Sequence, residues 1–372
     1  MGALLLMPIL RSQEEDEAHL RSKAMALEQQ GTNREAEQVW DRIAKTDPQN
    51  AEALAHLGLL EARQEHYDTA IDYYRRAVVI KSDLPGLQMN LGLALFKAAQ
   101  FPDAIKTFSA EIKKHPGDRR LTILLGMAHY GMKDYLVTIP YLQRAIESDP
   151  QNLTLRMTLA RSCMWSKQYE CVVKVHEEMV TLKAESAEGD MLAGEALDQM
   201  RDSAGAEKEF RAAVLANPKE RNVHFGLGYL LWTQNKWTEA ADEFELELQN
   251  NSAHVKARIY QADSRVRLNE IAKALPELER LGASDREESL VHRDLGMIYA
   301  ESGRSEDAIR ELKIAIDSEP EDPEPHMLAA KLYRSMGRGD EANAELDRAR
   351  RLRPQYHRSL QEMIDSIETP AP

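Results

Sequence analysis

Apolar residues recur at helical spacing along most of the chain, in pairs of short stretches separated by a few polar residues. Residues 53–78 show the pattern, because ALAHLGLLEARQ and HYDTAIDYYRRAV each place apolar side chains on one face and charged ones on the other. Each stretch therefore predicts an amphipathic helix. Gly58 lies inside the first of them, where glycine costs about 1 kcal/mol relative to alanine. Ala70 lies in the second, where a larger apolar residue would bury more area.

Small residues recur at both places with a period of 34 residues. The first series is Ala24, Gly58, Gly92, Gly126, Ala160, Gly194, Gly228, Ala262, Gly296 and Ala330. The second series is Ala36, Ala70, Ala104, Thr138, Val172, Ala206, Ala240, Ala274, Ala308 and Ala342. A fixed period of this size predicts a solenoid of stacked helix pairs.

Large side chains and prolines follow the same period. Four residues beyond the second series stand Trp40, Tyr74, Phe108, Leu142, His176, Phe210, Phe244, Leu278, Leu312 and Leu346, of which only His176 is not a large apolar residue. Prolines end six periods, at Pro48, Pro116, Pro150, Pro218, Pro320 and Pro354. We expect the two small residues to meet where paired helices cross, the large residue to fill the space before the next pair, and proline to end the second helix.

The 34-residue spacing and the L-G…A-x3-F…P pattern resemble the tetratricopeptide repeat family. The resemblance implies an all-α fold, a right-handed α-solenoid (superhelix) of helix-turn-helix repeats. It covers residues 17–356 as ten contiguous repeats: 17–50, 51–84, 85–118, 119–152, 153–186, 187–220, 221–254, 255–288, 289–322 and 323–356. Residues 1–16 remain as an apolar N-terminal tail, which could also be a remnant signal or anchor. Residues 357–372 are expected to form a capping helix and a short tail.

Residues that tolerate a left-handed backbone mark the turn inside several repeats. Gly31, Asn235, Asn269, Gly303 and Gly337 all stand at position 15, counted from the first residue of each repeat. We therefore expect the first helix of these repeats to end there.

Composition narrows the classes of function. The chain of 372 residues has a formal net charge of −14, which argues against binding nucleic acid through its phosphates. No apolar run is long enough to span a membrane. Cys163 and Cys171 are the only cysteines, too few for a disulfide scaffold, although a disulfide between them is geometrically conceivable. The compartment stays open between cytoplasmic and exported or periplasmic, and membrane contact is expected only if the N-terminal tail is an anchor.

The resemblance implies that positions 2, 5, 6, 9, 12 and 13 of the first helices line a concave surface. In repeats three to seven these positions are mostly apolar and rich in methionine, which suits adaptable binding surfaces. The predicted peptide-binding groove consists of Met89, Asn90, Leu93, Phe96, Ile123, Met127, Tyr130, Met157, Arg161, Met164, Trp165, Met191, Phe225, Tyr229 and Trp232. Two alternatives stay open: the same residues could pack against each other within the superhelix, or form a contact between copies of the chain.

Catalytic and metal-binding signals are weak. Cys163, Cys171 and His176 share the fifth repeat, but a small apolar cysteine and a core histidine explain them better than a Cys–His dyad. No Cys-x-x-Cys or His-x-x-x-His pattern indicates a metal, and no phosphate-binding loop indicates a nucleotide cofactor. The asparagine ladder and the carboxylate clamp of two groups of these repeat proteins are both absent.

The sequence thus predicts a non-catalytic protein–protein interaction scaffold, without cofactor, metal or small-molecule substrate. Its partner would be a partly apolar peptide or helix held in the groove. The alternative is a regulatory or assembly subunit of a larger enzyme or of a membrane or secretion complex.

Overall fold

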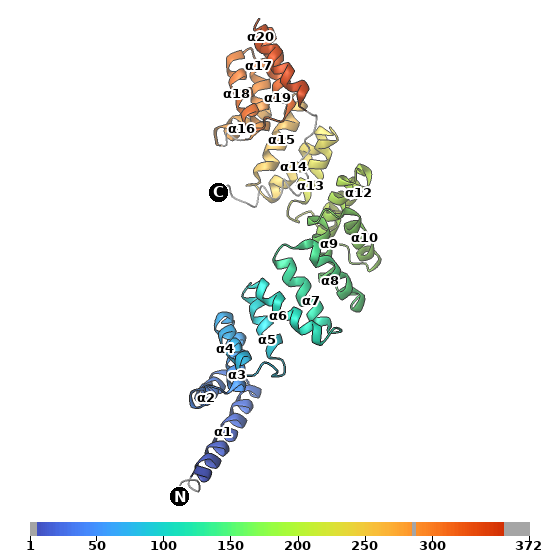
Figure 1. The fold of residues 1–372 in the computed structure, drawn as a ribbon. Coiled ribbons are helices and arrows are strands. Elements are labelled where there is room, and N and C mark those ends of the chain that lie inside the picture. Colours follow the sequence, from blue (N-terminus) through green and yellow to red (C-terminus); the bar gives the residue numbers. More distant parts are fainter. Residues whose placement is uncertain (1–5, 285–287, 353–372) are drawn as a thin grey trace. The chain divides into compact units, whose positions relative to one another are not determined.

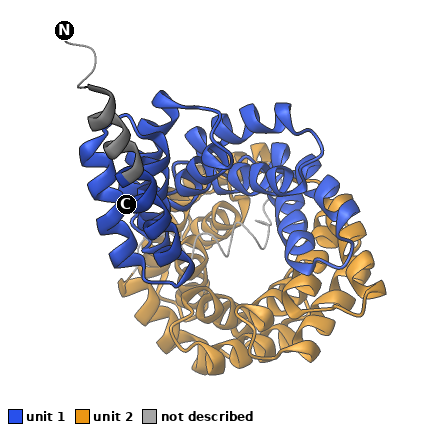
Figure 2. Ribbon diagram, turned by 90° about the horizontal axis from the view of Figure 1, so that it is seen from below, with its two compact units in different colours: residues 1–166 blue, residues 167–372 orange. Residues whose placement is uncertain are grey.

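The computed structural model describes residues 6–284 and 288–352, with side chains from residue 16 onward, and these residues contain only helices and their connections (Figure 1). The chain divides into two compact units, residues 1–166 and 167–372, which are coloured separately in Figure 2. The helices of the first unit are α1 Leu6–Gln29, α2 Asn33–Thr46, α3 Ala51–Arg63, α4 Tyr67–Ile80, α5 Leu87–Lys97, α6 Phe101–Lys114, α7 Arg119–Gly131, α8 Tyr135–Ser148 and α9 Leu153–Trp165.

The second unit continues the same alternation. Its helices are α10 Tyr169–Thr181, α11 Ala187–Gln199, α12 Ser203–Ala216, α13 Val223–Thr233, α14 Trp237–Asn250, α15 Val255–Arg267, α16 Ile271–Ser284, α17 Ser289–Glu301, α18 Ser305–Ser318, α19 Pro323–Ser335 and α20 Gly339–Arg351. Odd-numbered helices are the first helices of the predicted repeats and even-numbered helices are the second. The predicted all-α solenoid is therefore confirmed, and the described helices fit ten repeats.

A left-handed residue ends the first helix of each repeat. Positive φ angles recur every 34 residues, at Gly31, Glu65, Ala99, Lys133, Lys167, Arg201, Asn235, Asn269, Gly303 and Gly337. The predicted conformation is present at all five glycines and asparagines, and five residues of other types adopt it as well. A non-glycine residue pays about 1–2 kcal/mol for this backbone, so the turn is imposed by the packing of the two helices that it joins.

The small residue at position 8 makes room for the large side chain at position 24 of its own repeat. A Cβ built on Gly58 would lie 2.8 Å from the ring of Tyr74, and one on Gly228 would lie 2.9 Å from the ring of Phe244. For Gly194 the nearest atoms likewise belong to Phe210, not to Ala206. At Gly296 a Cβ would also lie 3.3 Å from the backbone carbonyl oxygen of Ala308, at position 20. The predicted approach of positions 8 and 20 is therefore present there, and the contact between positions 8 and 24 within one repeat is an addition that the sequence reasoning missed.

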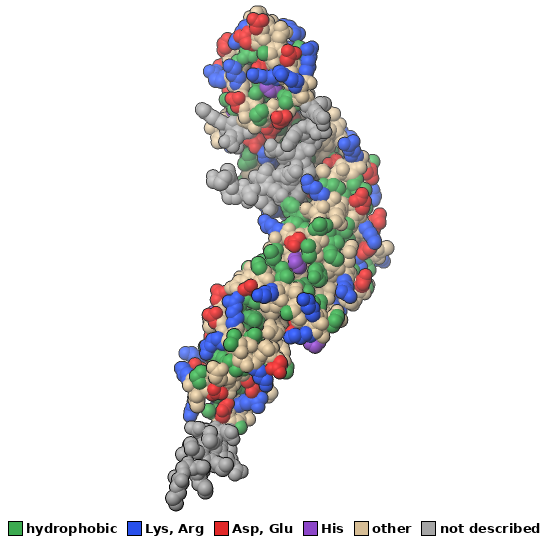
Figure 3. Space-filling view, viewed as in Figure 1, with side chains coloured by type: hydrophobic (Ala, Val, Ile, Leu, Met, Phe, Trp, Pro, Cys, Tyr) green, Lys and Arg blue, Asp and Glu red, His purple; other side chains and the backbone are tan. Residues whose placement is uncertain are grey.

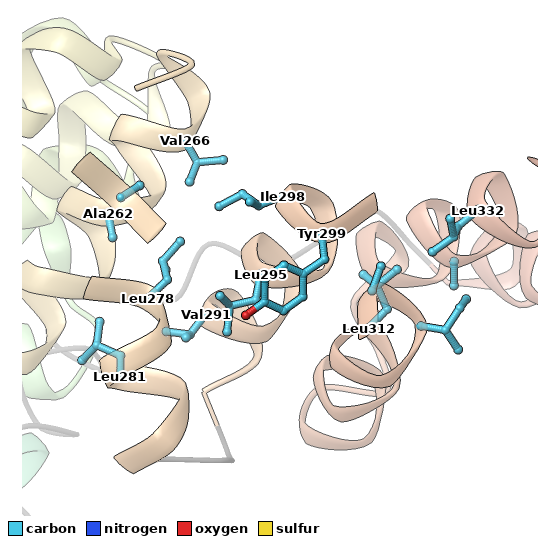
Figure 4. Close-up of a cluster of buried hydrophobic side chains, with 14 of the residues drawn as sticks. Ala262, Val266, Leu278, Leu281, Val291, Leu295, Ile298, Tyr299, Leu312 and Leu332 are labelled. Carbon is cyan, nitrogen blue, oxygen red and sulfur yellow. The ribbon is translucent and has the colours of Figure 1, made fainter. Parts of the chain in front are cut away.

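The position-20 residues and the position-24 side chains form the core of each repeat. Ala70, Ala104, Ala206 and Ala240 are fully buried. In the second unit the core continues from repeat to repeat, because Leu278 of α16 lies among residues of α15 and α17 (Figure 4). In repeats eight to ten the core therefore runs from one repeat into the next.

The segment before repeat one is helical from Leu6 onward. Helix α1 begins at Leu6, so residues 6–16 extend the first helix of repeat one. Pro8 does not prevent this, because the first backbone N–H groups of a helix have no partner within it. The predicted capping helix, residues 357–368, lies outside the described residues. Within the described part of the chain, none of the helices has the length and apolarity that crossing a bilayer requires.

Candidate functional site: the face of the first helices

Several successive first helices contact each other. In the second unit α11, α13, α15, α17 and α19 contact one another in order, and in the first unit α3 contacts α5. We call the residues at positions 2, 5, 6, 9, 12 and 13 of the first helices the first-helix face, taken separately in each unit.

An aromatic row runs along the edge of this face in the first unit. We define it as Phe96, Phe101, Tyr130, Tyr135 and Trp165. Phe96 meets Phe101 edge to face at 5.6 Å between ring centroids, Tyr130 meets Tyr135 in the same way at 5.6 Å, and Tyr135 stacks on Trp165 at 5.9 Å. The ring of Phe101 also covers Gly131, since a Cβ built there would lie 2.5 Å from Phe101 Cζ.

Two members of the aromatic row were missed by the sequence reasoning. Phe101 and Tyr135 stand at position 17, on the second helix, whereas the groove was assigned to first helices alone. The signal available was the aromatic residue that follows five residues after Phe96 and after Tyr130. The rings at position 17 pack edge to face on the rings at position 12, an arrangement that stabilises aromatic pairs.

The predicted groove residues of the first unit differ in how much of them reaches solvent. Leu93 is 36% exposed and Trp165 is 39% exposed, both high for large apolar side chains. Met164 is buried. The half-buried residues are Met89, Asn90, Phe96, Ile123, Met127, Tyr130, Met157 and Arg161. The first unit therefore offers a mixed apolar surface in which Leu93 and Trp165 are the most accessible positions.

In the second unit the predicted aromatic residues pack mainly on each other. Phe225 is fully buried and Tyr229 is buried, so they support the surface from below and offer a partner little area. Trp232 remains half-buried, meets Tyr260 edge to face at 4.9 Å, and donates a hydrogen bond from its Nε1 to Asp263 at 2.5 Å. Self-packing, one of the alternatives from the sequence, thus describes Phe225 and Tyr229. Met191 is half-buried.

Charged side chains at the next first-helix positions form a buried network. Arg293 bonds Asp263 and Asp294 and reaches Glu324 at 2.8 Å, and Arg267 reaches Glu324 from the solvent side at 3.1 Å. Burial, only partly offset by the charge of Arg293, raises the pKa of Asp294 to about 7. The first-helix face of repeats eight to ten is therefore polar and internally paired.

The cysteines and His176 do not form a catalytic dyad. Both cysteines are disulfide-bonded, so neither is the free apolar thiol that the sequence favoured, and neither can act as a nucleophile. His176 is buried, as expected of a core position, but it bonds Asp190.

Two shallow hollows lie away from the first-helix face. One of about 290 Å³ lies between the turn before α7 and the end of α8, beside Arg119 and Arg144. The other, of about 280 Å³, lies beside His326 and Arg351. Neither contains a predicted groove residue.

Comparison with known proteins decides the family. A tetratricopeptide repeat model matches residues 21–85, 89–161, 191–254 and 261–323, and a second matches residues 299–364. The chain belongs to the tetratricopeptide repeat family. This family assignment agrees with the 34-residue recurrence of left-handed turns and small residues.

Individual relatives of the chain are distant and longer. Protein O-mannosyl-transferase Tmtc3 of Drosophila melanogaster is 28% identical over 112 residues, which are 30% of this chain and 12% of that protein. The peroxisomal targeting signal receptor of Pichia angusta is 22% identical over 229 residues, 58% of this chain and 40% of that protein. A solved structure of Naa15/Naa10 bound to HypK-THB shares 16% identity at a TM-score of 0.47, over 94% of this chain and 60% of that one. The chain spans well under half the length of these curated relatives.

Proposed function

We propose that the chain is a non-catalytic protein-interaction scaffold whose first-helix face in repeats three to five binds a partly apolar peptide or helix. The observation that carries the proposal is the aromatic row, in which Trp165 is 39% exposed and stacks on Tyr135. Met89, Met127 and Met157 on the first helices of the same repeats are half-buried. Such a surface combines rigid aromatic anchors with adaptable neighbours, as interaction surfaces commonly do. Membership of the tetratricopeptide repeat family supports a protein partner.

The expected affinity is moderate. Four buried apolar anchors contribute about 6–12 kcal/mol before losses. Restricting the motion of the partner and of the methionine side chains offsets much of that, so we expect a Kd of about 1 μM.

The test introduces a negative charge at each of the two most exposed positions of the candidate groove. Leu93→Glu and Trp165→Glu, combined in one chain, should abolish capture of the partners that the unaltered chain retains, because each places a carboxylate in an apolar contact. Val79→Glu is the matched control, since Val79 is 87% exposed on a second helix of the same unit. The three proteins are compared by affinity purification from the native cell with quantitative mass spectrometry. Retention of every partner by the double variant, at unchanged helicity, would exclude this face.

The alternative is a regulatory or assembly subunit of a larger enzyme or complex. The named relatives include a transferase and a targeting receptor, each much longer than the matched segment. A subunit would co-purify in a fixed ratio with the same proteins at every salt concentration, whereas a peptide-binding scaffold would exchange its partners within minutes. Native mass spectrometry of the purified assembly distinguishes the two.

A further inference from the structure

Position 4 of the first helix faces position 23 of the second helix in the last repeats, and each of these pairs joins a basic group to a carboxylate. The pairs in repeats seven, nine and ten are His224–Glu243, His292–Glu311 and His326–Glu345, each at 2.6 Å, and repeat eight has Arg258–Glu277 at 3.3 Å. Repeat six departs from this rule, because its two positions hold Asp190 and Glu209. Two carboxylates thus stand where every later repeat has one.

A histidine from the preceding repeat completes the group. His176 occupies position 24 of repeat five, where the other repeats place a large apolar residue. Its Nε2 lies 2.8 Å from Oδ1 of Asp190 and 3.8 Å from Oε2 of Glu209. One donor atom from each of the three side chains lies within 4.8 Å of the other two. The three residues come from α10, α11 and α12, and all belong to the second unit.

The three side chains are largely shielded from solvent. The side chains of His176, Asp190 and Glu209 are 9%, 5% and 13% exposed. Lys208 bonds Oε1 of Glu209 at 2.7 Å, but its own side chain is 79% exposed, so it neutralises Glu209 from the solvent side. The second oxygen of Glu209 faces His176 and Asp190. Burying two carboxylates against one imidazole is costly unless a cation stands between them.

We propose that His176, Asp190 and Glu209 bind a divalent transition metal ion, with Zn²⁺ as the best fit. One imidazole nitrogen and two carboxylate oxygens are ligands that Zn²⁺ accepts, and three protein ligands leave a fourth position for water. The ion replaces the basic group that repeats seven to ten carry at position 4. It also ties α10 to the helices of repeat six.

Sequence reasoning missed this site because its ligands do not form a local motif. His176 and Asp190 are 14 residues apart, and Asp190 and Glu209 are 19 apart, so only the repeat packing brings them together. The expected absence of a metal rested on adjacent ligand pairs alone.

The test measures Zn²⁺ binding to the full chain after treatment with a chelator, in buffer without reductant so that both cysteines stay oxidised. Isothermal titration should show one Zn²⁺ per chain, Zn²⁺ should raise the melting temperature more than Mg²⁺ does, and Co²⁺ should give visible absorption bands. Asp190→Asn, Glu209→Gln and His176→Phe should each weaken binding more than about tenfold, because even residues behind the ligands contribute that much. Phenylalanine suits the place of His176, since Phe210 and Phe244 occupy the same position in the next two repeats.

The matched control is Glu311→Gln, which alters the corresponding position of repeat nine without touching the three ligands. It should bind Zn²⁺ as the unaltered chain does. The proposal is overturned if the unaltered chain, folded by circular dichroism, shows no Zn²⁺-dependent rise in melting temperature. It is also overturned if the folded Asp190→Asn and Glu209→Gln chains bind Zn²⁺ as tightly as the unaltered chain, because the ion then sits elsewhere.

Discussion

The ring of Phe108 lies directly over Gly92, so that a Cβ built on Gly92 would stand 2.3 Å from Phe108 Cε1. Gly92 is on the first helix of repeat three and Phe108 is on the second. The helix therefore accepts the weak helix former because the ring needs its space. The same relation holds for Gly58 with Tyr74 and for Gly296 with Leu312.

Gly92→Ala should destabilise the chain although alanine favours the helix. The propensity gain is about 1 kcal/mol, but overpacking costs about 1–3 kcal/mol, and the Phe108 ring is fully buried with little room to move. Equilibrium urea unfolding gives the change. Gly339→Ala is the control, since a Cβ there meets nothing within 4 Å. Adding Phe108→Leu to Gly92→Ala should recover part of the lost stability, because the smaller side chain leaves room for the new Cβ. If the effects of the two substitutions on the free energy of unfolding were strictly additive, the proposed contact would be contradicted.

The left-handed turns make a second prediction. Ala99 adopts a φ of 56° at position 15, a backbone that costs a non-glycine residue about 1–2 kcal/mol. Ala99→Gly should therefore stabilise the chain by about 0.5–1 kcal/mol, part of the gain being lost to the greater freedom of glycine in the unfolded chain. Gly303→Ala, at φ 75°, should destabilise it by about 1 kcal/mol. Thermal and urea unfolding measure the free energy of unfolding of both variants. If Ala99→Gly destabilised the chain and Gly303→Ala stabilised it, the left-handed turn geometry would be contradicted.

Asp294 gives a pH-dependent prediction. Its pKa of about 7 in the folded chain exceeds the usual value of 3.8, so the folded chain holds one more proton than the unfolded chain between about pH 4 and pH 7. The free energy of unfolding must then fall as pH rises through this window. Asp294→Asn removes this titration, so the stability of the variant relative to the unaltered chain should improve by about 2 kcal/mol between pH 5 and pH 8. Urea unfolding of both chains at pH 5 and pH 8 tests this prediction. The same difference in free energy of unfolding between the two chains at both pH values would contradict it.

The titration of His254 changes the stability of the chain with pH in the opposite direction. Burial lowers its pKa to about 4, and its Nδ1 accepts a hydrogen bond from the backbone N–H of Ala257 at the start of α15. Below about pH 6.5 the unfolded chain takes up a proton that the folded chain refuses, so stability is lost as pH falls. His254→Asn keeps a capping side chain and should lose about 2 kcal/mol less than the unaltered chain between pH 7 and pH 4.5. Denaturant unfolding at the two pH values measures this difference.

The fold was predictable from the sequence because nearly every repeat places small and large apolar residues at the same positions. Gly58, Ala70 and Tyr74 recur in register with their counterparts, so even single exceptions such as His176 do not obscure the period. The side-chain contacts within each repeat were harder to predict. Positions 8 and 24 meet because a ring leans back along its helix, a direction that spacing alone does not give.

The sequence did not reveal how exposed each residue of the candidate groove is. Leu93 and Trp165 are accessible, as expected from their place on the first helices, whereas Phe225 is fully buried under neighbouring rings. Whether a side chain at a given position is covered depends on the neighbours' sizes in adjacent repeats. The same dependence hid Phe101, Tyr135 and the group around His176, all of which arise from residues of different helices.

Site-specific photo-crosslinking tests the central claim most directly. A benzophenone amino acid is placed singly at position 93, 165 or 79 of the full chain in the native cell, and adducts are identified by mass spectrometry after irradiation. The proposed groove predicts that positions 93 and 165 crosslink to the same partner segment and that position 79 does not. A partner captured at position 79 while positions 93 and 165 yield none would contradict the assignment of function to the first-helix face.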